Sequence, residues 1–484
     1  MSETFEELLP STRRALEHRI ATAQTEGRAP SVVGAVVRDG RTVWTGARGS
    51  TDGSAAPRGS TDGSEVAREP HADTQYRIGS ITKTFTAALV LRLRDEGLLE
   101  LADPLEKHLP DAAITTGVGE VTIAQLLAHT SGLAAETPAP WWERTPGSLR
   151  PTLAEVLGEA PLRHPSGRVH HYSNPGYTML GSIVEKLRGE GWETVLRNEV
   201  LEPLGMTRTS AQPLSPYAKG WAVHPWADVL MPEPAEDLGL MAPAGQLWST
   251  AADLARWARF LTEGDTRVLS PESVAEMRRP AAVPDAASPD AGYGLGLQLL
   301  RRDGRTLVGH TGSLPGFLAT LWVSVEDGLA GIAMANATSG PLIGGLASDL
   351  VRITAEREPR IPAPWTALPD ADPALLELTG PWYWGPAPFL VRLTAGRGLE
   401  LVPLSGAGRG SRFRAEEDGT WTGLDGYYAG ETLRTVHGPD GRETDSVTHL
   451  DLGSFVFTRR PYDPGDAVPG GVDPQGWRPV PPAS

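Results

Sequence analysis

A proline-rich stretch, EREPRIPAPWTALPDADP from Glu356 to Pro373, divides the chain into two parts with different sequence patterns. Proline does not fit a helix interior or a central strand, so this density of proline predicts a linker and a domain boundary. A chain of 484 residues is also longer than one average domain. We therefore predict a larger domain over residues 1–357, a linker over 358–373, a smaller domain over 374–462 and a Pro/Gly-rich tail over 463–484.

The larger domain is predicted to contain a sheet whose strands come from both of its ends. An amphipathic helix near the N-terminus precedes the apolar runs SVVGAVV and TVWTGA, and the RDGR between these runs is typical of a hairpin. Two further strand-like runs extend from Phe317 to Asn336, and a helix is expected from Pro341 to Glu356. The residues from about 80 to 300 look mostly helical. The predicted fold class is therefore α+β, an antiparallel sheet covered by helices with a helical region inserted between its strands.

Two other segments have patterns of their own. After the linker, short alternating runs such as FLVRLTA, GLELVPL and SFVFTRR are broken by glycine and aspartate, which predicts a small antiparallel barrel or sandwich. The near-duplication GSTDGSAAPR and GSTDGSEVAR, from Gly49 to Arg68, is too short and too polar for a structural repeat. We predict that it is an expanded flexible loop.

Composition excludes several classes of function. The formal net charge of −16 disfavours a nucleic-acid surface, because phosphate binding needs clustered Lys and Arg. The chain has no cysteine, which rules out disulfides, thiolate metal sites and cysteine nucleophiles. No apolar run reaches the length of a membrane span, and the N-terminus lacks the apolar core of a secretory signal. We therefore expect a cytoplasmic protein with no membrane or nucleic-acid partner, and the sequence does not predict its oligomeric state.

Motifs for cofactors and metals are missing from the sequence. It contains no G-x-G-x-x-G, P-loop, H-E-x-x-H or G-x-S-x-G motif, so no cofactor is expected. The adjacent His170 and His171 suggest metal ligation, but neighbouring histidines on a turn are more often solvated, and no metal is expected.

The stretch RIGSITKTF places a serine three residues before one of only four lysines, in a chain with 44 basic residues. Positions i and i+3 lie on one face of a helix, so Ser80 and Lys83 can meet. A serine hydroxyl is a weak nucleophile until a base takes its proton, and burial depresses the pKa of a lysine enough for that role. Arginine stays protonated and cannot act in this way. A capping serine and a surface lysine would give the same short pattern, so the motif alone leaves both interpretations open.

The stretch HHYSNPGYTMLG contains a second pair of suitable polar groups, Tyr172 and Asn174. A tyrosine held near an ammonium group loses its proton more easily and can act as a second base. The carboxamide of Asn174 can bridge a lysine and a substrate amide. Ordinary core packing of the tyrosine and a turn at the Asn-Pro pair are the alternative.

The stretch VGHTGSLPGF follows an apolar run and places His310, Thr311, Gly312 and Ser313 on a predicted edge strand. Glycine there allows a substrate to approach the backbone closely, so Thr311 and Gly312 are candidate substrate-binding residues. The amide of Ser313 could share an oxyanion with the amide of Ser80. The alternative is a turn between strands with an incidental histidine.

The order S-x-x-K, Y-x-N, H-T-G resembles the serine β-lactamase and penicillin-binding protein family. The chain is most similar to its class C-type branch, which includes class C β-lactamases, DD-peptidases, D-aminopeptidases and family VIII esterases. The stretches VTIAQLLAHTSGL, LEPLGMTRT, PAGQLWSTAADLARW and YGLGLQ match that branch too, and the resemblance covers about residues 15 to 355. It implies a β-lactamase/transpeptidase-like fold, and the C-terminal β module resembles the lipocalin-like domain of some relatives.

The resemblance implies a role for each motif residue. Ser80 is the acylated nucleophile, and Lys83 is its activating base. Tyr172 passes the proton to the leaving group and later activates water, while Asn174 orients Lys83 and the substrate. His310 stands where the lactamases have the lysine of K-T-G, which is more similar to the esterases and D-peptidases. That replacement weakens the case for binding the carboxylate of a β-lactam.

We therefore predict a serine hydrolase that forms an acyl-enzyme on Ser80 and acts on a small ester or a D-amino-acid-containing peptide or amide. Trp141 and Trp142 follow the HTSGL segment and either line an acyl pocket or plug a loop, and Glu136 has a spacing that could reach the cleft. The alternatives are a transacylase that cyclises peptides, a weak β-lactamase, and a catalytically silent relative that binds peptides. A binding module has no need to keep Lys83, so the intact motifs count against silence.

Overall fold

The computed structural model describes residues 7–53, 69–111, 118–149, 151–284, 290–405, 408–437, 446–463 and 465. The chain forms two compact units, Met1–Ile361 and Pro362–Ser484. Most of the near-duplicated loop and most of the C-terminal tail lie outside the described residues.

Unit 1 is built on an antiparallel sheet with the strand order β2-β1-β11-β10-β9-β8-β7. Its strands are β1 (Ser31–Arg38), β2 (Arg41–Gly49), β7 (Ala291–Tyr293), β8 (Gln298–Arg302), β9 (Arg305–Leu314), β10 (Phe317–Ser324) and β11 (Leu329–Ala335). β1 and β2 form the predicted hairpin, and Asp39 and Gly40 in its turn both have positive φ, 49° and 74°. β1 also pairs with β11, so strands from both ends of the unit meet within one sheet. The predicted α+β fold class is confirmed.

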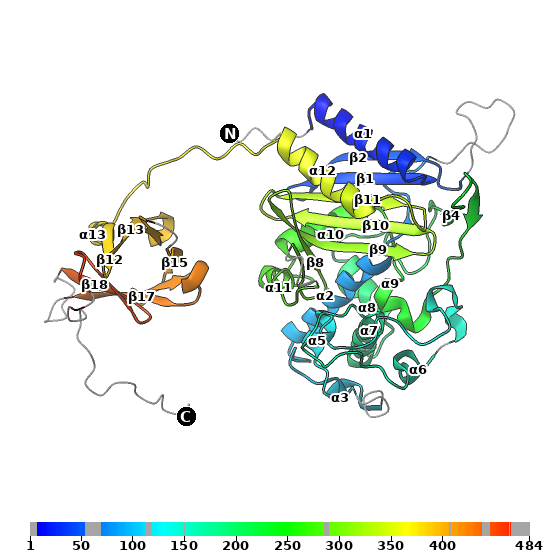
Figure 1. Cartoon of the computed structure of the whole chain (residues 1–484), viewed down its shortest axis with the longest axis horizontal. Helices are drawn as coiled ribbons and strands as arrows, with labels where there is room; N and C mark the ends of the chain where they lie inside the picture. The colour runs from blue at the N-terminus through cyan, green and yellow to red at the C-terminus, as the bar shows by residue number, and fades with distance from the viewer. Residues whose placement is uncertain are drawn as a thin grey trace. The chain divides into compact units, whose positions relative to one another are not determined.

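Helices α1 (Pro10–Glu26) and α12 (Ile343–Arg357) cover one face of the sheet, and the inserted helical region lies on the other (Figure 1). Successive side chains of β1 point to opposite faces, so Val32 packs beneath these two helices while Val33 joins the core on the other side. Burial on both faces explains why the sequence of β1 is a continuous apolar run.

The described part of the inserted region contains three longer helices and many short elements. The longer helices are α2 (Thr82–Asp95), α7 (Asn174–Arg188) and α10 (Ala251–Glu263). The short helices are α3 (Leu105–His108), α5 (Ile123–Leu127), α6 (Leu153–Leu157), α8 (Trp192–Leu196), α9 (Ala242–Gly245) and α11 (Pro271–Met277). The remaining short elements are β3 (Tyr76–Arg77), β4 (Trp221–Val223), β5 (Leu230–Pro232) and β6 (Trp248–Ser249), with single turns η1 (Gly79–Ile81), η2 (Trp142–Arg144), η3 (Gly147–Leu149), η4 (Arg197–Leu201) and η5 (Gly239–Met241).

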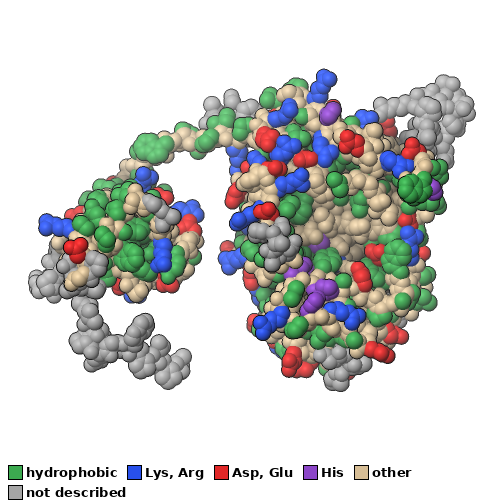
Figure 2. All heavy atoms as spheres, in the orientation of Figure 1, with side chains coloured by type: hydrophobic (Ala, Val, Ile, Leu, Met, Phe, Trp, Pro, Cys, Tyr) green, Lys and Arg blue, Asp and Glu red, His purple; other side chains and the backbone are tan. Residues whose placement is uncertain are grey.

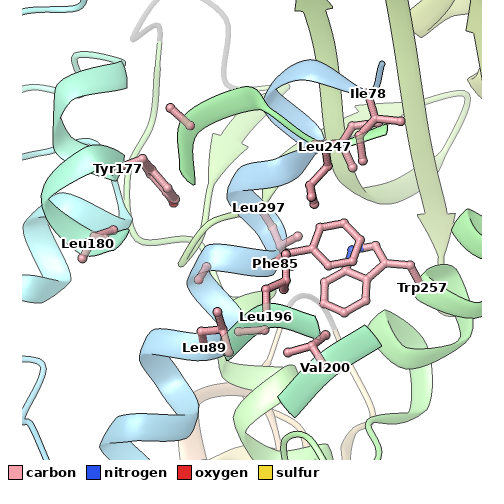
Figure 3. Close-up of a cluster of buried hydrophobic side chains, with 14 of the residues drawn as sticks. Ile78, Phe85, Leu89, Tyr177, Leu180, Leu196, Val200, Leu247, Trp257 and Leu297 are labelled. Atoms are coloured by element: carbon pink, nitrogen blue, oxygen red, sulfur yellow. The ribbon is translucent and has the colours of Figure 1, made fainter. Parts of the chain in front are cut away.

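Most residues of helix α2 are buried, and its aromatic packing fixes its position. Phe85 stacks on Trp257 of α10 with ring centroids 3.9 Å apart, among the aliphatic side chains shown in Figure 3. Removing a buried phenylalanine ring of this kind destabilises a protein by about 3–5 kcal/mol. Since α2 begins directly after the turn that carries Ser80, the same packing holds the candidate nucleophile in place.

Unit 2 is a closed antiparallel barrel preceded by the short helix α13 (Pro373–Leu378). The strands are β12 (Gly380–Trp384), β13 (Ala387–Leu393), β14 (Leu399–Pro403), β15 (Ser411–Ala415), β16 (Trp421–Gly423), β17 (Thr432–His437), β18 (Val447–Leu452) and β19 (Phe455–Thr458), with a turn η6 (Ala395–Arg397) and a turn η7 (Gly426–Tyr428). Alternate residues such as Trp382 and Phe413 fill the interior, which confirms the predicted antiparallel barrel.

Candidate active site

Ser80 and Lys83 lie in hydrogen-bond contact at the junction of η1 and α2. The Lys83 Nζ donates to Ser80 Oγ at 3.0 Å and to the carbonyl oxygen of Ala244 at 2.6 Å. Lys83 is fully buried, and burial lowers its pKa to about 7, although the negative charges of Glu136 and Glu143 act in the opposite direction. Ser80 remains partly exposed. The pair therefore combines a reachable hydroxyl with an amine that is neutral in about half of the molecules at pH 7.

The backbone of β9 packs directly against the turn that carries Ser80. A Cβ atom on Gly312 would lie 1.9 Å from the carbonyl oxygen of Ile78 and 3.2 Å from the amide nitrogen of Ser80. A Cβ atom on Gly79, whose φ is +49°, would lie 2.7 Å from the amide nitrogen of Ser313. Only glycine fits either position, and the close approach brings together the two amides predicted to form an oxyanion hole.

β9 is an interior strand rather than the edge strand that the sequence suggested. It lies between β10 and β8 because β8 returns along it as a further hairpin strand. The pairing with β8 ends at Gly309, however, so the residues from His310 to Leu314 pair only with β10. The side of this segment that faces away from β10 has no strand partner, as expected of an edge strand, and it packs against η1.

Tyr172 completes a cluster around the lysine. Its ring centroid lies 5.0 Å from Lys83 Nζ, and its hydroxyl is hydrogen-bonded to Ser80. Burial raises the pKa of Tyr172 above its ordinary value, and the Ser80 hydrogen bond only partly offsets this. The expected lowering of this pKa by a neighbouring ammonium is wrong, because burial outweighs it and because Lys83 is itself only partly charged near pH 7.

Asn174 makes a different contact from the one predicted. It is the first residue of α7, after the N-cap Ser173, and its Nδ2 donates to Glu136 Oε1 at 2.9 Å. Among the described residues, its Oδ1 has no hydrogen-bond partner, and the structure shows no hydrogen bond between Asn174 and Lys83. The side chain is therefore oriented by a carboxylate rather than by the lysine.

His310 is enclosed by the protein on both sides of its ring. Its Nδ1 donates to the carbonyl oxygen of Thr311 at 2.5 Å, so its Nε2 accepts from the hydroxyl of Tyr293 at 3.0 Å. Burial and the nearby charge of Lys83 lower the pKa of His310 to about 3. The imidazole is therefore neutral and does not provide a positive charge. Thr311 is fixed by Gln298, to which its amide donates at 3.0 Å.

Glu136, Trp141 and Trp142, predicted near the substrate, line one cavity of about 350 Å³ together with Glu143. The indole Nε1 of Trp142 donates to Glu136 Oε2 at 2.7 Å, and that of Trp141 donates to Glu143 Oε2 at 2.9 Å. The cavity lies near the cluster around Ser80, because the charges of Glu136 and Glu143 both act on Lys83. Glu143 was missed from the sequence, since nothing in its immediate neighbours distinguishes it from a solvated glutamate.

His129 is a second residue that sequence reasoning missed. Its Nδ1 accepts from the amide of Ser173 at 3.0 Å, its carbonyl oxygen accepts from the amide of His171 at 2.7 Å, and its ring lies 4.1 Å from that of Tyr172. It is fully buried and has a positive φ of 56°. His129 therefore positions the Tyr172–Asn174 segment. The available signal was its place in the HTSGL stretch, which was used only as a family flank.

Two further observations concern metal sites and membrane spans in the described residues. On the face shown in Figure 2, histidine side chains gather below the sheet, over the helical region. Within the described ranges, no group of three or more His, Cys, Asp or Glu side chains is placed to hold a metal ion. No helix in the described part of the chain is long and apolar enough to cross a membrane.

The fold and the cluster around Ser80 together are typical of one family of proteins, and comparison with known families shows which one it is. Residues 16–356 match the family described as beta-lactamase, and the chain belongs to that family. Residues 371–459 match a domain of unknown function, DUF7586. The resemblance to the serine β-lactamase and penicillin-binding protein family, inferred from the motifs, is confirmed.

Individual relatives agree with this assignment. Penicillin-binding protein 4 of Amycolatopsis lactamdurans is 30% identical over 320 residues, which cover 63% of this chain and 83% of that protein. The octameric penicillin-binding protein homologue from Pyrococcus abyssi superposes with a TM-score of 0.61 at 23% identity, covering 92% of this chain and 99% of the other. A D-stereospecific amidohydrolase from Streptomyces sp. superposes with a TM-score of 0.56 at 26% identity, covering 71% and 98% of the two chains.

Proposed function

We propose that this protein is a serine hydrolase that forms an acyl-enzyme on Ser80 and cleaves a small ester or an amide of a D-amino acid. The observation that carries the proposal is the contact of 3.0 Å between Lys83 Nζ and Ser80 Oγ, together with a lysine pKa lowered to about 7 by burial. A neutral amine in that position can accept the hydroxyl proton. The amidohydrolase from Streptomyces, a fold relative, supports the substrate class.

The first half of the reaction forms the acyl-enzyme. The Lys83 amine takes the proton of Ser80 as Oγ bonds to the substrate carbonyl carbon, and the amides of Ser80 and Ser313 receive the negative charge on the carbonyl oxygen. As the intermediate collapses, the bond to the leaving group breaks. The leaving group takes a proton from the Tyr172 hydroxyl, which in turn is reprotonated by Lys83.

The second half releases the product. A water molecule gives one proton to the pair formed by Tyr172 and Lys83 while its oxygen attacks the acyl carbon. Ser80 regains its proton from this pair when the ester bond breaks. Tyr172 acts as a proton relay in its neutral form in both halves, because burial raises its pKa. Since His310 is neutral, it does not supply a fixed charge for a β-lactam carboxylate, which favours an ester or amide substrate.

Turnover of p-nitrophenyl acetate by the wild type and by Ser80→Ala tests this proposal. We expect release of p-nitrophenol by the wild type and loss of at least about a thousandfold in the variant, because the remaining groups cannot form the acyl-enzyme. Mass spectrometry of the wild type quenched during turnover should show an acetyl group on the peptide that contains Ser80. Equal rates in both proteins, or acetylation elsewhere, would contradict the assignment.

A further inference from the structure

The outer edge of β9, which is the side facing away from β10 beyond Gly309, presents the backbone groups of alternate residues only. The amide of Thr311 bonds to a side chain of β8, so Thr311 points outward, and Ser313 two residues later does the same. A Cβ atom on Gly79 would lie 2.7 Å from the Ser313 amide nitrogen, which agrees with this direction. A substrate backbone that pairs with this edge therefore meets the groups of Thr311 and Ser313.

Both backbone groups of Thr311 are already bonded within the protein. Its amide donates to Gln298 Oε1 at 3.0 Å, and its hydroxyl donates to the same oxygen at 3.2 Å. Its carbonyl oxygen accepts from His310 Nδ1 at 2.5 Å. Gln298 is the residue of β8 that pairs with Gly309, so its side chain continues the ladder beyond the last strand pair. Side chains of the protein thus close the outer edge at Thr311.

Ser313 is the position on this edge that stays open. It is exposed, and among the described residues the side chains bonded to the outward backbone groups of this segment contact Thr311 rather than Ser313. In the proposed reaction, the Ser313 amide receives the oxyanion, so the reacting carbonyl of the substrate lies at the open position.

The closed end of the edge is the one nearer the leaving group. Tyr172 protonates the leaving group in the proposed reaction, and its ring centroid lies 6.1 Å from that of His310, the residue before Thr311. The leaving group therefore lies toward Thr311. A peptide that continued past the scissile bond would find no free backbone group there, so its added length would bring no main-chain hydrogen bonds that could contribute to catalysis.

We propose that Gln298 is a specificity-determining residue that limits the useful length of the leaving group. By closing the outer edge of β9 at Thr311, it makes the enzyme an esterase or amidase with a short alcohol or amine as leaving group, rather than a peptidase that binds a continuing peptide chain. The proposal rests on the proposed function of Ser80 and narrows its substrate class.

The test compares kcat/KM for phenylalanine N-methylamide and phenylalanyl-glycyl-glycinamide, each with D- and L-phenylalanine, from the phenylalanine released. Both compounds break a secondary amide, and they differ in the length of the leaving group. For the faster enantiomer, the longer compound should be at most about fivefold better with the wild type. Gln298→Ala frees the Thr311 amide and should raise this ratio a further fivefold or so, as for one new hydrogen bond. A larger wild-type ratio, or a ratio that Gln298→Ala does not change, would overturn the proposal.

Two control variants separate the hydrogen bond from a general change of the sheet. Gln298→Glu keeps an oxygen that can accept from the Thr311 amide, so it should keep the wild-type ratio. Gln212→Ala removes an exposed glutamine from a loop and should also keep it. A ratio raised as much by Gln298→Glu as by Gln298→Ala would contradict the role of this acceptor.

Binding to Ser80→Ala separates failure of this proposal from failure of the proposed reaction, because calorimetry needs no turnover. Ser80→Ala should bind the two compounds with similar affinity. The double variant of Ser80→Ala and Gln298→Ala should bind the longer compound about fivefold tighter. That result supports the closed edge even if the wild type hydrolyses neither compound. Equal binding of both compounds to the double variant, or binding of neither, would refute it.

Discussion

The lowered pKa of Lys83 predicts the pH dependence of acylation. At its ordinary pKa of 10.5, a lysine is neutral in roughly one molecule in three thousand at pH 7, whereas at a pKa of about 7 about half of the molecules carry the neutral base. Since only the neutral amine accepts the proton of Ser80, kcat/KM should rise tenfold per pH unit below pH 7 and level off above it. Lys83→Arg, which has no neutral form at these pH values, should lose about a thousandfold or more.

The assay is kcat/KM for p-nitrophenyl acetate between pH 5 and 9, with far-UV circular dichroism at each pH to exclude unfolding. Lys83→Met, which fills similar space without a base, serves as the comparison for Lys83→Arg. A rise of kcat/KM with its midpoint near pH 4 to 5 would assign the base to a carboxylate instead. A flat profile, or a Lys83→Arg variant within tenfold of the wild type, would refute the role of the lysine.

Three other substitutions have outcomes set by the same contacts. Lys83→Met should stabilise the fold by up to about 4 kcal/mol at pH 7, because a buried lysine of lowered pKa destabilises the folded state below pH 10.5. This gain in stability should shrink as the pH rises from 7 to 10, and melting curves at pH 7 and pH 10 would measure it. Gly312→Ala places a methyl group 1.9 Å from the carbonyl oxygen of Ile78, so we expect kcat to fall about a hundredfold as β9 moves away from the nucleophile, which stopped-flow kinetics would measure. His129→Ala removes the acceptor of the Ser173 amide and should lower kcat more than it changes KM; an unchanged kcat would show that His129 does not position this segment.

Much of the fold follows from local patterns in the sequence. The hairpin at Asp39 and Gly40, the apolar run of β1 and the alternating strands of the barrel all depend on residues close together in the chain. The contact between Ser80 and Lys83 is equally local, since one helical turn separates them.

The features that the sequence did not predict depend on distant residues. Asn174 bonds to Glu136, which lies 38 residues earlier, and His310 bonds to Tyr293, which lies 17 residues earlier. The direction of the Tyr172 pKa is also a tertiary property, because it is set by how completely the folded chain excludes water from the ring. Spacing along the chain shows which groups are present but not which of them are desolvated together.

The two carboxylates of the cavity and the lysine base act on each other. The charges of Glu136 and Glu143 raise the pKa of Lys83 and so work against its neutral form. Glu143→Gln removes one of these charges, so the pH at which kcat/KM for p-nitrophenyl acetate reaches half of its maximum should fall. An unchanged midpoint would show that this carboxylate does not act on the base.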